Sequence, residues 1–291
     1  MVPLYKTEGI VLKQRDFLEA DKLITLYSRN LGKIKIIAKG IKRPGSKLGG
    51  RLELFTYCSL LLAKGRNLDI VSDVEIKSSH LKLREDLVKL SYGLYIIELV
   101  EKGVEERSKS FNLFNLLALS LSSLEDVDYS SLEALTRIFE AGIISFSGYK
   151  PTLERCVECG QRAEVVHSPQ SIVHRGQESE KCQSVKVSKC QSVNQKTEER
   201  REERVKFSVE KGGVLCRRCG EKDRDSLDIS PKTLEVMKHL FLADNHCNLL
   251  KNHRNLSRNH CNRPLKKLLR LYLSYHLNLN MKSQDLPLLG D

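Results

Sequence analysis

The chain has 291 residues, and its 49 Lys and Arg against 37 Asp and Glu give a formal net charge of +12. This length suits two domains of roughly 100 to 200 residues, and 40% hydrophobic residues can form a core in both, which excludes a wholly disordered chain. No apolar stretch reaches the roughly 18 residues of a membrane-spanning helix, and the start lacks the pattern of a secretory signal. We expect a cytoplasmic protein whose positive surface attracts a polyanion, with nucleic acid favoured over anionic lipid.

Five short segments with strand patterns follow one another near the start of the chain. They cover residues 9–13, 22–28, 33–38, 53–62 and 67–76. Turn residues separate them and no helix-length segment lies between them, so a small closed barrel is favoured over a βαβ unit. The sequence therefore predicts an OB-fold barrel over residues 1–78.

The hydrophobic period changes after Ser79. Apolar residues recur at helical spacing from Leu83 to Ile97 and again from Phe111 to Leu121. We therefore expect a mainly helical domain over residues 79–291, and an α+β fold class for the whole chain.

Three local patterns predict where later helices begin. Residues 130–133 form a capping-box pattern, from which a helix should run to about Phe146. Ser230 followed by Pro231 is an N-cap with proline at the first helical position. A last helix is expected over residues 264–279, which begin with proline.

Residues 164–204 differ in composition from their surroundings. Gln, Ser, Glu, Lys and Arg dominate, and the pentapeptide Lys-Cys-Gln-Ser-Val that begins at Lys181 recurs at Lys189. Too few apolar residues are present to offset the entropy of ordering such a segment. We therefore expect a disordered insertion.

Four of the nine cysteines form two C-x-x-C pairs, each followed by glycine. The pairs are Cys156 with Cys159 and Cys216 with Cys219. A two-residue gap lets both thiolates of one turn reach a single tetrahedral Zn²⁺ at about 2.3 Å from each sulfur. Because four protein ligands leave no open coordination position, we expect one structural zinc within residues 156–219. Free thiols in two unrelated turns are the alternative.

The other cysteines lack such a partner. We interpret Cys182, Cys190, Cys247 and Cys261 as incidental, and Cys58 as a small core residue. The Asn-His-Cys triplets at 245–247 and 259–261 lie in a polar stretch without the spacing of a known metal cage. A second metal site is therefore disfavoured.

A basic segment lies in the predicted barrel, with no acidic residue between Lys22 and Arg51. Its second half is a Gly-rich loop in which several cations can follow a phosphate backbone. We expect this segment to bind nucleic acid rather than to be only a solvated face. The candidate DNA-binding residues are Arg29, Lys33, Lys35, Lys39, Lys42, Arg43, Lys47 and Arg51.

The same loop contains a pattern close to a phosphate-binding P-loop. Residues 40–47 have its glycine spacing, but the final Lys and Ser are exchanged and Leu48 with two glycines is a poor start for a helix. No other catalytic motif stands out, so we expect no enzyme. A magnesium-dependent nuclease or nucleotidyl enzyme is the alternative that uses this loop.

An ordered set of motifs resembles the bacterial RecO family of recombination mediators. The motifs are residues 7–13, 19–22, 38–43, 46–48, 139–140, 148–153, the two cysteine pairs, 212–215 and 263–276. The resemblance extends over the whole chain apart from the insertion, and the order of the motifs makes it specific.

The resemblance implies an N-terminal OB-fold joined to a helical domain, often with a four-cysteine zinc site. Proteins of this family bind single- and double-stranded DNA, anneal complementary strands, contact the acidic C-terminal tail of the single-strand-binding protein SSB, and work with RecR to help load RecA. It therefore implies a non-enzymatic mediator of the RecF pathway of DNA repair that is cytoplasmic and associated with the nucleoid. An RNA-binding module of similar build is the alternative.

Overall fold

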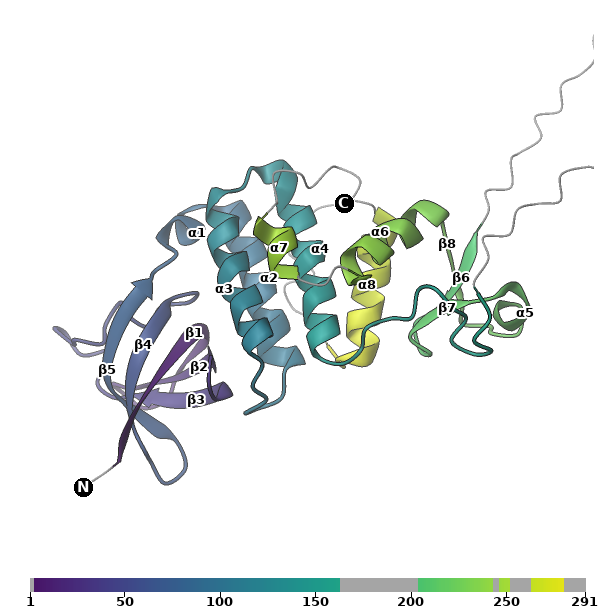
Figure 1. Ribbon diagram of the computed structural model, residues 1–291. Helices are drawn as coiled ribbons and strands as arrows, with labels where there is room; N and C mark the ends of the chain where they lie inside the picture. The colour runs from purple at the N-terminus through teal and green to yellow at the C-terminus, as the bar shows by residue number, and fades with distance from the viewer. Residues whose placement is uncertain (1–2, 163–203, 243–245, 252–262, 280–291) are drawn as a thin grey trace, which may run out of the picture.

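The computed structural model describes residues 3–162, 204–242, 246–251 and 263–279. Its elements form three parts that lie in a row (Figure 1): a β-barrel at one end, a group of helices in the middle, and a small sheet at the other end. No helix among these residues is both long enough and apolar enough to cross a membrane.

The N-terminal part is a closed five-stranded barrel. Its strands are β1 (Leu4–Asp16), β2 (Lys22–Ser28), β3 (Gly32–Ala38), β4 (Tyr57–Ala63) and β5 (Asp69–Ser78). They are joined in the order β1-β2-β3-β5-β4, with β3 and β5 parallel and the other pairs antiparallel. This is the strand arrangement of an OB-fold, so the predicted barrel is confirmed.

Apolar side chains from every strand fill the barrel. The residues of strand β4 alternate between buried and partly buried positions, because successive side chains of a strand point to opposite faces. One face thus supplies the barrel interior. The buried side chains of the barrel interior include Val11, Ile24, Leu26, Ile36, Leu52, Leu60, Leu62, Val71 and Val74.

Helices form the middle of the molecule. They are α1 (Leu81–Glu85), α2 (Leu87–Gly103), α3 (Phe111–Asp126), α4 (Tyr129–Phe146), α6 (Pro231–Leu242), α7 (His246–Lys251) and α8 (Arg263–His276). Helix α4 is buried along most of its length because α2, α3, α6, α7 and α8 all contact it. The predicted helical domain is thus present, and α4 is its centre.

The predicted capping box of α4 is wrong. The helix begins at Tyr129, so Ser130 lies inside it, and no side chain caps the preceding Asp128 position. The Tyr129 hydroxyl donates to the Asp86 carboxylate at 2.7 Å, a tertiary contact that the local pattern does not contain. The end of the helix at Phe146 agrees with the prediction.

The two later helix starts follow their local signals. The Ser230 hydroxyl accepts the Thr233 backbone N–H at 3.2 Å, which is the bond of an N-cap. Pro264 is the second residue of α8, although the helix ends at His276 rather than at Leu279.

The barrel packs directly against the helices. Ile10, Tyr27 and Phe55 belong to the same apolar cluster as the buried residues of α2. Gly93 of α2 allows this approach, because a Cβ there would meet the Phe55 ring at 3.2 Å and Leu83 at 2.8 Å. The segment that connects α2 to α3, residues 104–110, also lies against the barrel, since the Arg107 backbone N–H donates to the Lys33 carbonyl at 2.9 Å and the Ser110 backbone N–H to the Tyr27 hydroxyl at 3.1 Å.

The last part is a small sheet of β6 (Val205–Ser208), β7 (Gly213–Leu215) and β8 (Leu227–Ile229), in the order β7-β6-β8, with the short helix α5 (Arg217–Gly220). The Thr152 backbone N–H donates to the Gly212 carbonyl, and the Thr152 carbonyl accepts from the Val214 backbone N–H, both at 2.9 Å. These bonds hold the chain after α4 against β7. Gly213 is required there, because a Cβ would lie 2.4 Å from the Thr152 carbonyl oxygen. The predicted insertion, apart from Arg204, lies outside the described residues.

Candidate metal centre and nucleic-acid interface

The two cysteine pairs lie on neighbouring turns of the small sheet. The backbone N–H of Val157 donates to the Val214 carbonyl at 3.0 Å, which places the first pair beside β7, and the second pair follows β7 directly. Each pair closes a turn of its own, since Gly160 N–H donates to Cys156 O at 2.9 Å and Gly220 N–H to Cys216 O at 2.8 Å.

The four cysteine sulfurs come together in this arrangement. All four Sγ atoms lie within 4.8 Å of one another, and those of Cys159 and Cys216 are 3.6 Å apart. A tetrahedral zinc with bonds of about 2.3 Å separates its sulfurs by about 3.8 Å. The four predicted ligands therefore fit a single metal ion of this kind.

The charge state of the thiols also favours a cation at this place. Burial raises the pKa of the Cys156 thiol, but backbone N–H groups of Cys216, Cys159 and Glu158 outweigh it and lower the pKa to about 6. A hydrogen bond with the Cys216 sulfur, together with burial and the sulfurs of Cys159 and Cys156, raises the pKa of Cys219 to about 12. Four thiolates at this spacing thus need a positive ion between them.

The structure places two of the remaining cysteines and one histidine in packed surroundings. Cys58 is buried in the barrel, where burial raises its pKa to about 12, in agreement with a core residue. Cys247 packs beside the helical core, and His246 is buried with its ring 5.6 Å from that of Phe146. Cys182, Cys190 and Cys261 lie outside the described residues. We call the two turns that carry Cys156, Cys159, Cys216 and Cys219 the cysteine knuckle. Within the described part of the chain, these four cysteines are the one group of three or more His, Cys, Asp or Glu side chains at metal-binding distance.

The basic loop between β3 and β4 is built from successive turns. Backbone bonds join Arg43 to Gly40, Ser46 to Arg43 and Gly49 to Ser46, each three residues apart and each 3.1 Å long. No helix follows Lys47. A P-loop needs a helix start at that point, so the P-loop pattern does not form one here.

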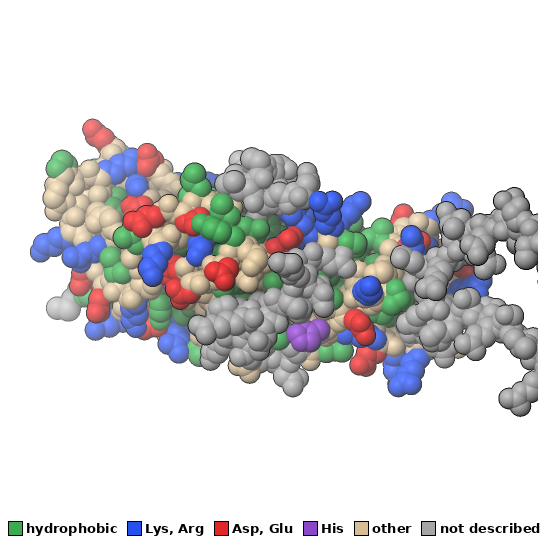
Figure 2. Space-filling view, turned by 90° about the horizontal axis from the view of Figure 1, so that it is seen from above, with side chains coloured by type: hydrophobic (Ala, Val, Ile, Leu, Met, Phe, Trp, Pro, Cys, Tyr) green, Lys and Arg blue, Asp and Glu red, His purple; other side chains and the backbone are tan. Residues whose placement is uncertain are grey.

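Three cations of this loop are exposed and free. Lys39, Arg43 and Lys47 form no ion pair with any described residue. Lys42 lies 2.8 Å from the Asp16 carboxylate, and the Arg51 guanidinium donates to the Val74 carbonyl at 3.1 Å. Figure 2 shows Lys and Arg side chains on the barrel end of the molecule, interspersed with Asp and Glu, and further ones along its length.

The cations in β3 and in the turn before it are engaged within the protein. Arg29 pairs with Glu8 at 3.2 Å, and Lys35 pairs with Glu106. Lys33 is only 8% exposed and donates to the Glu101 carbonyl at 2.5 Å. Burial lowers the pKa of its ammonium.

Lys33 therefore departs from the sequence-based expectation. The connection from α2 to α3 covers this face of β3, since the Arg107 backbone N–H donates to the Lys33 carbonyl at 2.9 Å. Because its ammonium is largely buried and bonded to the Glu101 carbonyl, Lys33 is not a free surface cation, and we leave it out of the candidate interface.

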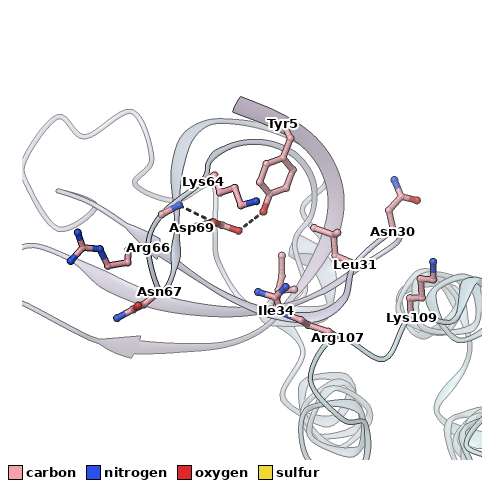
Figure 3. Close-up of a pocket in the computed structure, with 11 residues that line it drawn as sticks. Tyr5, Asn30, Leu31, Ile34, Lys64, Arg66, Asn67, Asp69, Arg107 and Lys109 are labelled. Atoms are coloured by element: carbon pink, nitrogen blue, oxygen red, sulfur yellow. Dashed lines mark hydrogen bonds between the residues drawn. The ribbon is translucent and has the colours of Figure 1, made fainter. Parts of the chain in front are cut away.

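A second group of cations was not singled out from the sequence. Lys64 and Arg66, in the turn between β4 and β5, lie across a cavity from Arg107 and Lys109 of the α2–α3 connection (Figure 3). In the sequence, the first two residues indicate only a turn. The other two lie far along the chain, so no local pattern could have joined them.

Together these features define a class of protein: an OB-fold barrel with free surface cations, followed by a helical domain that carries a four-cysteine knuckle. The family model described as "Recombination protein O N terminal" matches residues 1–80. The model described as "Recombination protein O C terminal" matches residues 84–189 and 194–285. The chain therefore belongs to the RecO family, as the sequence motifs indicated.

Individual relatives agree over nearly the full length. The chain is 32% identical over 286 residues to a protein of Desulforamulus reducens, which covers 97% of this chain and 93% of the relative. It is 34% identical over 281 residues to one of Pelotomaculum thermopropionicum, covering 96% and 92%. Both relatives carry the name "DNA repair protein RecO". The matched family is thus one of recombination proteins.

Proposed function

We propose that this protein is a recombination mediator in DNA repair, which binds single- and double-stranded DNA on its barrel. The observation that carries this proposal is the exposed, unpaired set of Lys39, Arg43 and Lys47 at one end of an OB-fold. The names of the relatives support DNA repair as the process. Cations in this arrangement bind the phosphate backbone and not a particular base sequence.

The proposed mechanism uses binding free energy and no covalent chemistry. When loop cations neutralise the phosphates of one strand, the repulsion from a second strand falls, so complementary strands approach and anneal. The protein thus promotes annealing without hydrolysing a nucleotide.

The proposal extends to partners through membership of the RecO family. The helical domain docks on the C-terminal tail of SSB, which concentrates the protein where single strands are coated. With RecR, it then helps to load RecA. We propose that this takes place in the cytoplasm, on the nucleoid.

The cysteine knuckle is proposed to hold one zinc ion through Cys156, Cys159, Cys216 and Cys219. The support is the spacing of the four sulfurs and the donor set, which is typical of structural zinc. The ion supplies no catalysis, because four thiolates fill its coordination shell. Its effect is to fix the two turns of the knuckle to each other.

Strand annealing tests the proposal. Complementary oligonucleotides are mixed with the protein, with and without an SSB coat, without ATP, and with magnesium present or absent. We expect faster annealing in every case, including on coated strands. An equal preference for RNA, or magnesium-dependent cleavage, contradicts the proposal and favours the RNA-binding or enzymatic alternative.

A matched pair of variants locates the effect. In the loop variant, Lys39, Lys42, Arg43 and Lys47 are all replaced by Ala. In the control variant, four exposed cations outside the barrel are replaced instead: Lys82, Lys150, Lys232 and Lys267. We expect the loop variant to lose annealing and the control variant to keep it, although the net charge falls equally in both.

A further inference from the structure

The barrel has a cavity at the end opposite the basic loop. Strand β4 runs antiparallel to β1 and ends with Ala63 opposite Leu4, so the β4–β5 turn lies where β1 begins. The basic loop lies at the other end of β1, because the Lys42 backbone N–H donates to the Ala20 carbonyl, just after that strand. The cavity beside the β4–β5 turn has a volume of ≈ 530 Å³.

Four cations surround this cavity. They are Lys64, Arg66, Arg107 and Lys109, and none of them forms an ion pair with a described residue. Figure 3 shows Lys64 extending toward the Tyr5 hydroxyl and Arg107 rising from the opposite side beneath Ile34. Arg66 points outward from the β4–β5 turn, away from Tyr5, and Lys109 lies on the opposite side of the cavity. Two separate segments of the chain thus bring positive charge to one hollow.

The one acidic residue of the lining is already satisfied. Asp69 accepts the Gly65 backbone N–H at 2.9 Å through one oxygen and the Tyr5 hydroxyl through the other. These bonds hold the carboxylate on the β4–β5 side of the cavity, as the dashed lines in Figure 3 show. Four cations against one carboxylate leave the cavity positive, so its ligand is an anion.

The remaining lining residues narrow the class of anion. Leu31 and Ile34 form an apolar wall, and Asn30 and Asn67 also line the cavity, with carboxamides that point outward on opposite sides of it. A volume of this size is typical of a site for a small ligand. A nucleotide fits this combination, because its phosphate needs the cations, its sugar and base need an apolar surface, and carboxamides can bond to base edges. A peptide of Asp and Glu alone would pair with the cations but leave the apolar wall unused.

We propose that this cavity is a second nucleic-acid site, which binds the phosphate and nucleoside of one nucleotide. The inference rests on the proposed function, since it adds a site to the DNA-binding barrel. With the loop at one end and the cavity at the other, a single barrel can hold two strands at once. Annealing needs two strands in one place.

The test compares thymidine 5′-monophosphate with thymidine as probes, using calorimetry on the full chain. The cavity variant replaces Lys64 and Arg107 by Gln, which removes both charges and keeps most of the side-chain volume. The control variant replaces the exposed Lys82 and Lys232 by Gln. We expect the wild type and the control to bind the nucleotide, and the cavity variant to bind it at least ten-fold more weakly. Thymidine should bind more weakly than its phosphate to the wild type and to the control, and this difference should shrink in the cavity variant, which lacks two of the cations that hold the phosphate.

Three results overturn the inference: no binding of the nucleotide by the wild type, equal affinity in the cavity variant, or binding of an Asp/Glu tetrapeptide in place of the nucleotide. Circular dichroism and thermal unfolding of the cavity variant establish that it is folded. Lys64→Glu alone gives a second test that leaves the Arg107 connection intact, with the same expected loss.

The loop variant separates this inference from the proposed function. If it loses DNA binding while the cavity variant binds nucleotide and DNA normally, the inference fails and the proposed function stands. If the cavity variant loses nucleotide binding but the loop variant binds DNA as the wild type does, the proposed function of the loop fails instead. A last comparison measures how much affinity the cavity variant loses for an oligonucleotide with a 5′-phosphate and for the same oligonucleotide with a 5′-hydroxyl. A larger loss for the phosphorylated form assigns the site to strand ends, and equal losses assign it to internal phosphates.

Discussion

The barrel and the cysteine knuckle are held in their folds by different forces. The barrel encloses side chains such as Ile24, Leu26 and Ile36, none of which is exposed. In the knuckle, residues 155–162 and 216–226, the buried residues are only Cys156 and Gly220. Hydrophobic burial therefore stabilises the barrel, whereas the knuckle depends on bonds to its sulfurs.

Because of this difference, the residues that bind ligand and the residues that stabilise the fold are distinct in the barrel but the same in the knuckle. In the barrel, cations on the outside can be replaced without disturbing the core, so binding and stability respond to different residues. In the knuckle, the candidate ligands are themselves the scaffold, and a change in one of them alters the fold. The predictions below test this contrast, from the largest expected effect to the smallest.

The largest effect is expected at Cys156. Structural zinc in small peptides contributes about 10–16 kcal/mol of binding free energy, and Cys156→Ser removes one of its four ligands. We expect one zinc per chain in the wild type, loss of the metal in the variant, and rapid hydrogen exchange in the knuckle with the barrel still protected. Cys58→Ala, in the barrel core, is the control that keeps the metal. A folded wild type without metal contradicts the zinc assignment.

The helical domain gives the next largest effect, at a buried ionic cluster. Arg137 and Glu140 of α4 form an ion pair of 2.7 Å at 2% and 0% exposure, and the Tyr95 hydroxyl donates to Glu140 at 2.5 Å. Glu140→Ala leaves the arginine buried and unpaired, which costs about 3–5 kcal/mol. Urea unfolding measures this loss.

A matched control for that cluster lies on the same helix. Glu133 is partly exposed and pairs with Lys266 at 3.5 Å, so Glu133→Ala should cost at most about 1 kcal/mol. If Glu140→Ala and Glu133→Ala lower the free energy of unfolding equally, burial does not determine the effect of the ion pair, which contradicts this prediction.

Two lysines of the barrel should respond in opposite ways. Lys33→Met removes a buried hydrogen bond to the Glu101 carbonyl, so we expect about 1–3 kcal/mol lower stability and unchanged DNA affinity. Lys47→Ala removes an exposed charge, so we expect unchanged stability and weaker DNA binding. Unfolding midpoints and DNA titrations on both variants check the pair. A loss of DNA affinity in folded Lys33→Met returns that residue to the interface.

The smallest effect concerns the pH dependence of the barrel. Lys77, the Tyr57 hydroxyl and Arg29 all donate to the Glu8 carboxylate and lower its pKa from 4.5 to about 2. Because the folded pKa lies below the ordinary one, ionised Glu8 stabilises the fold above about pH 4.5, and this is lost as the pH falls toward 2. The stability gap between wild type and Glu8→Gln should therefore shrink over that range. A gap that stays constant in urea unfolding shows that the Glu8 contacts do not contribute.

Local sequence patterns were sufficient for the features that local chemistry determines. Strand alternation and turns gave the barrel, and a two-residue gap within each cysteine pair predicted the knuckle ligands, because each pair occupies a single turn. Ser230 gave the start of α6 for the same reason: its cap bond reaches only to Thr233.

Tertiary contacts decided the rest. The sequence pattern places Lys33 on a strand, but it does not show that the segment near Glu101 and Glu106 packs over this residue. That packing buries a charge that the pattern places on the surface. The cavity joins Lys64 to Arg107, two residues that only the packing of the α2–α3 connection against the barrel brings together. In α4, the bond from Tyr129 to Asp86 accompanies a helix start two residues earlier than the capping pattern indicates.

The salt dependence of single-stranded DNA affinity tests the central claim most directly, namely that free cations of the barrel loop hold the phosphate backbone. If about 6 phosphates are neutralised, a plot of log K against log salt has a slope of about −4 for the wild type. Removal of the four loop charges should make this slope shallower by about 3, while the control variant with four other charges removed keeps the wild-type slope. A wild-type slope near zero, or equal slopes in the loop and control variants, contradicts the account.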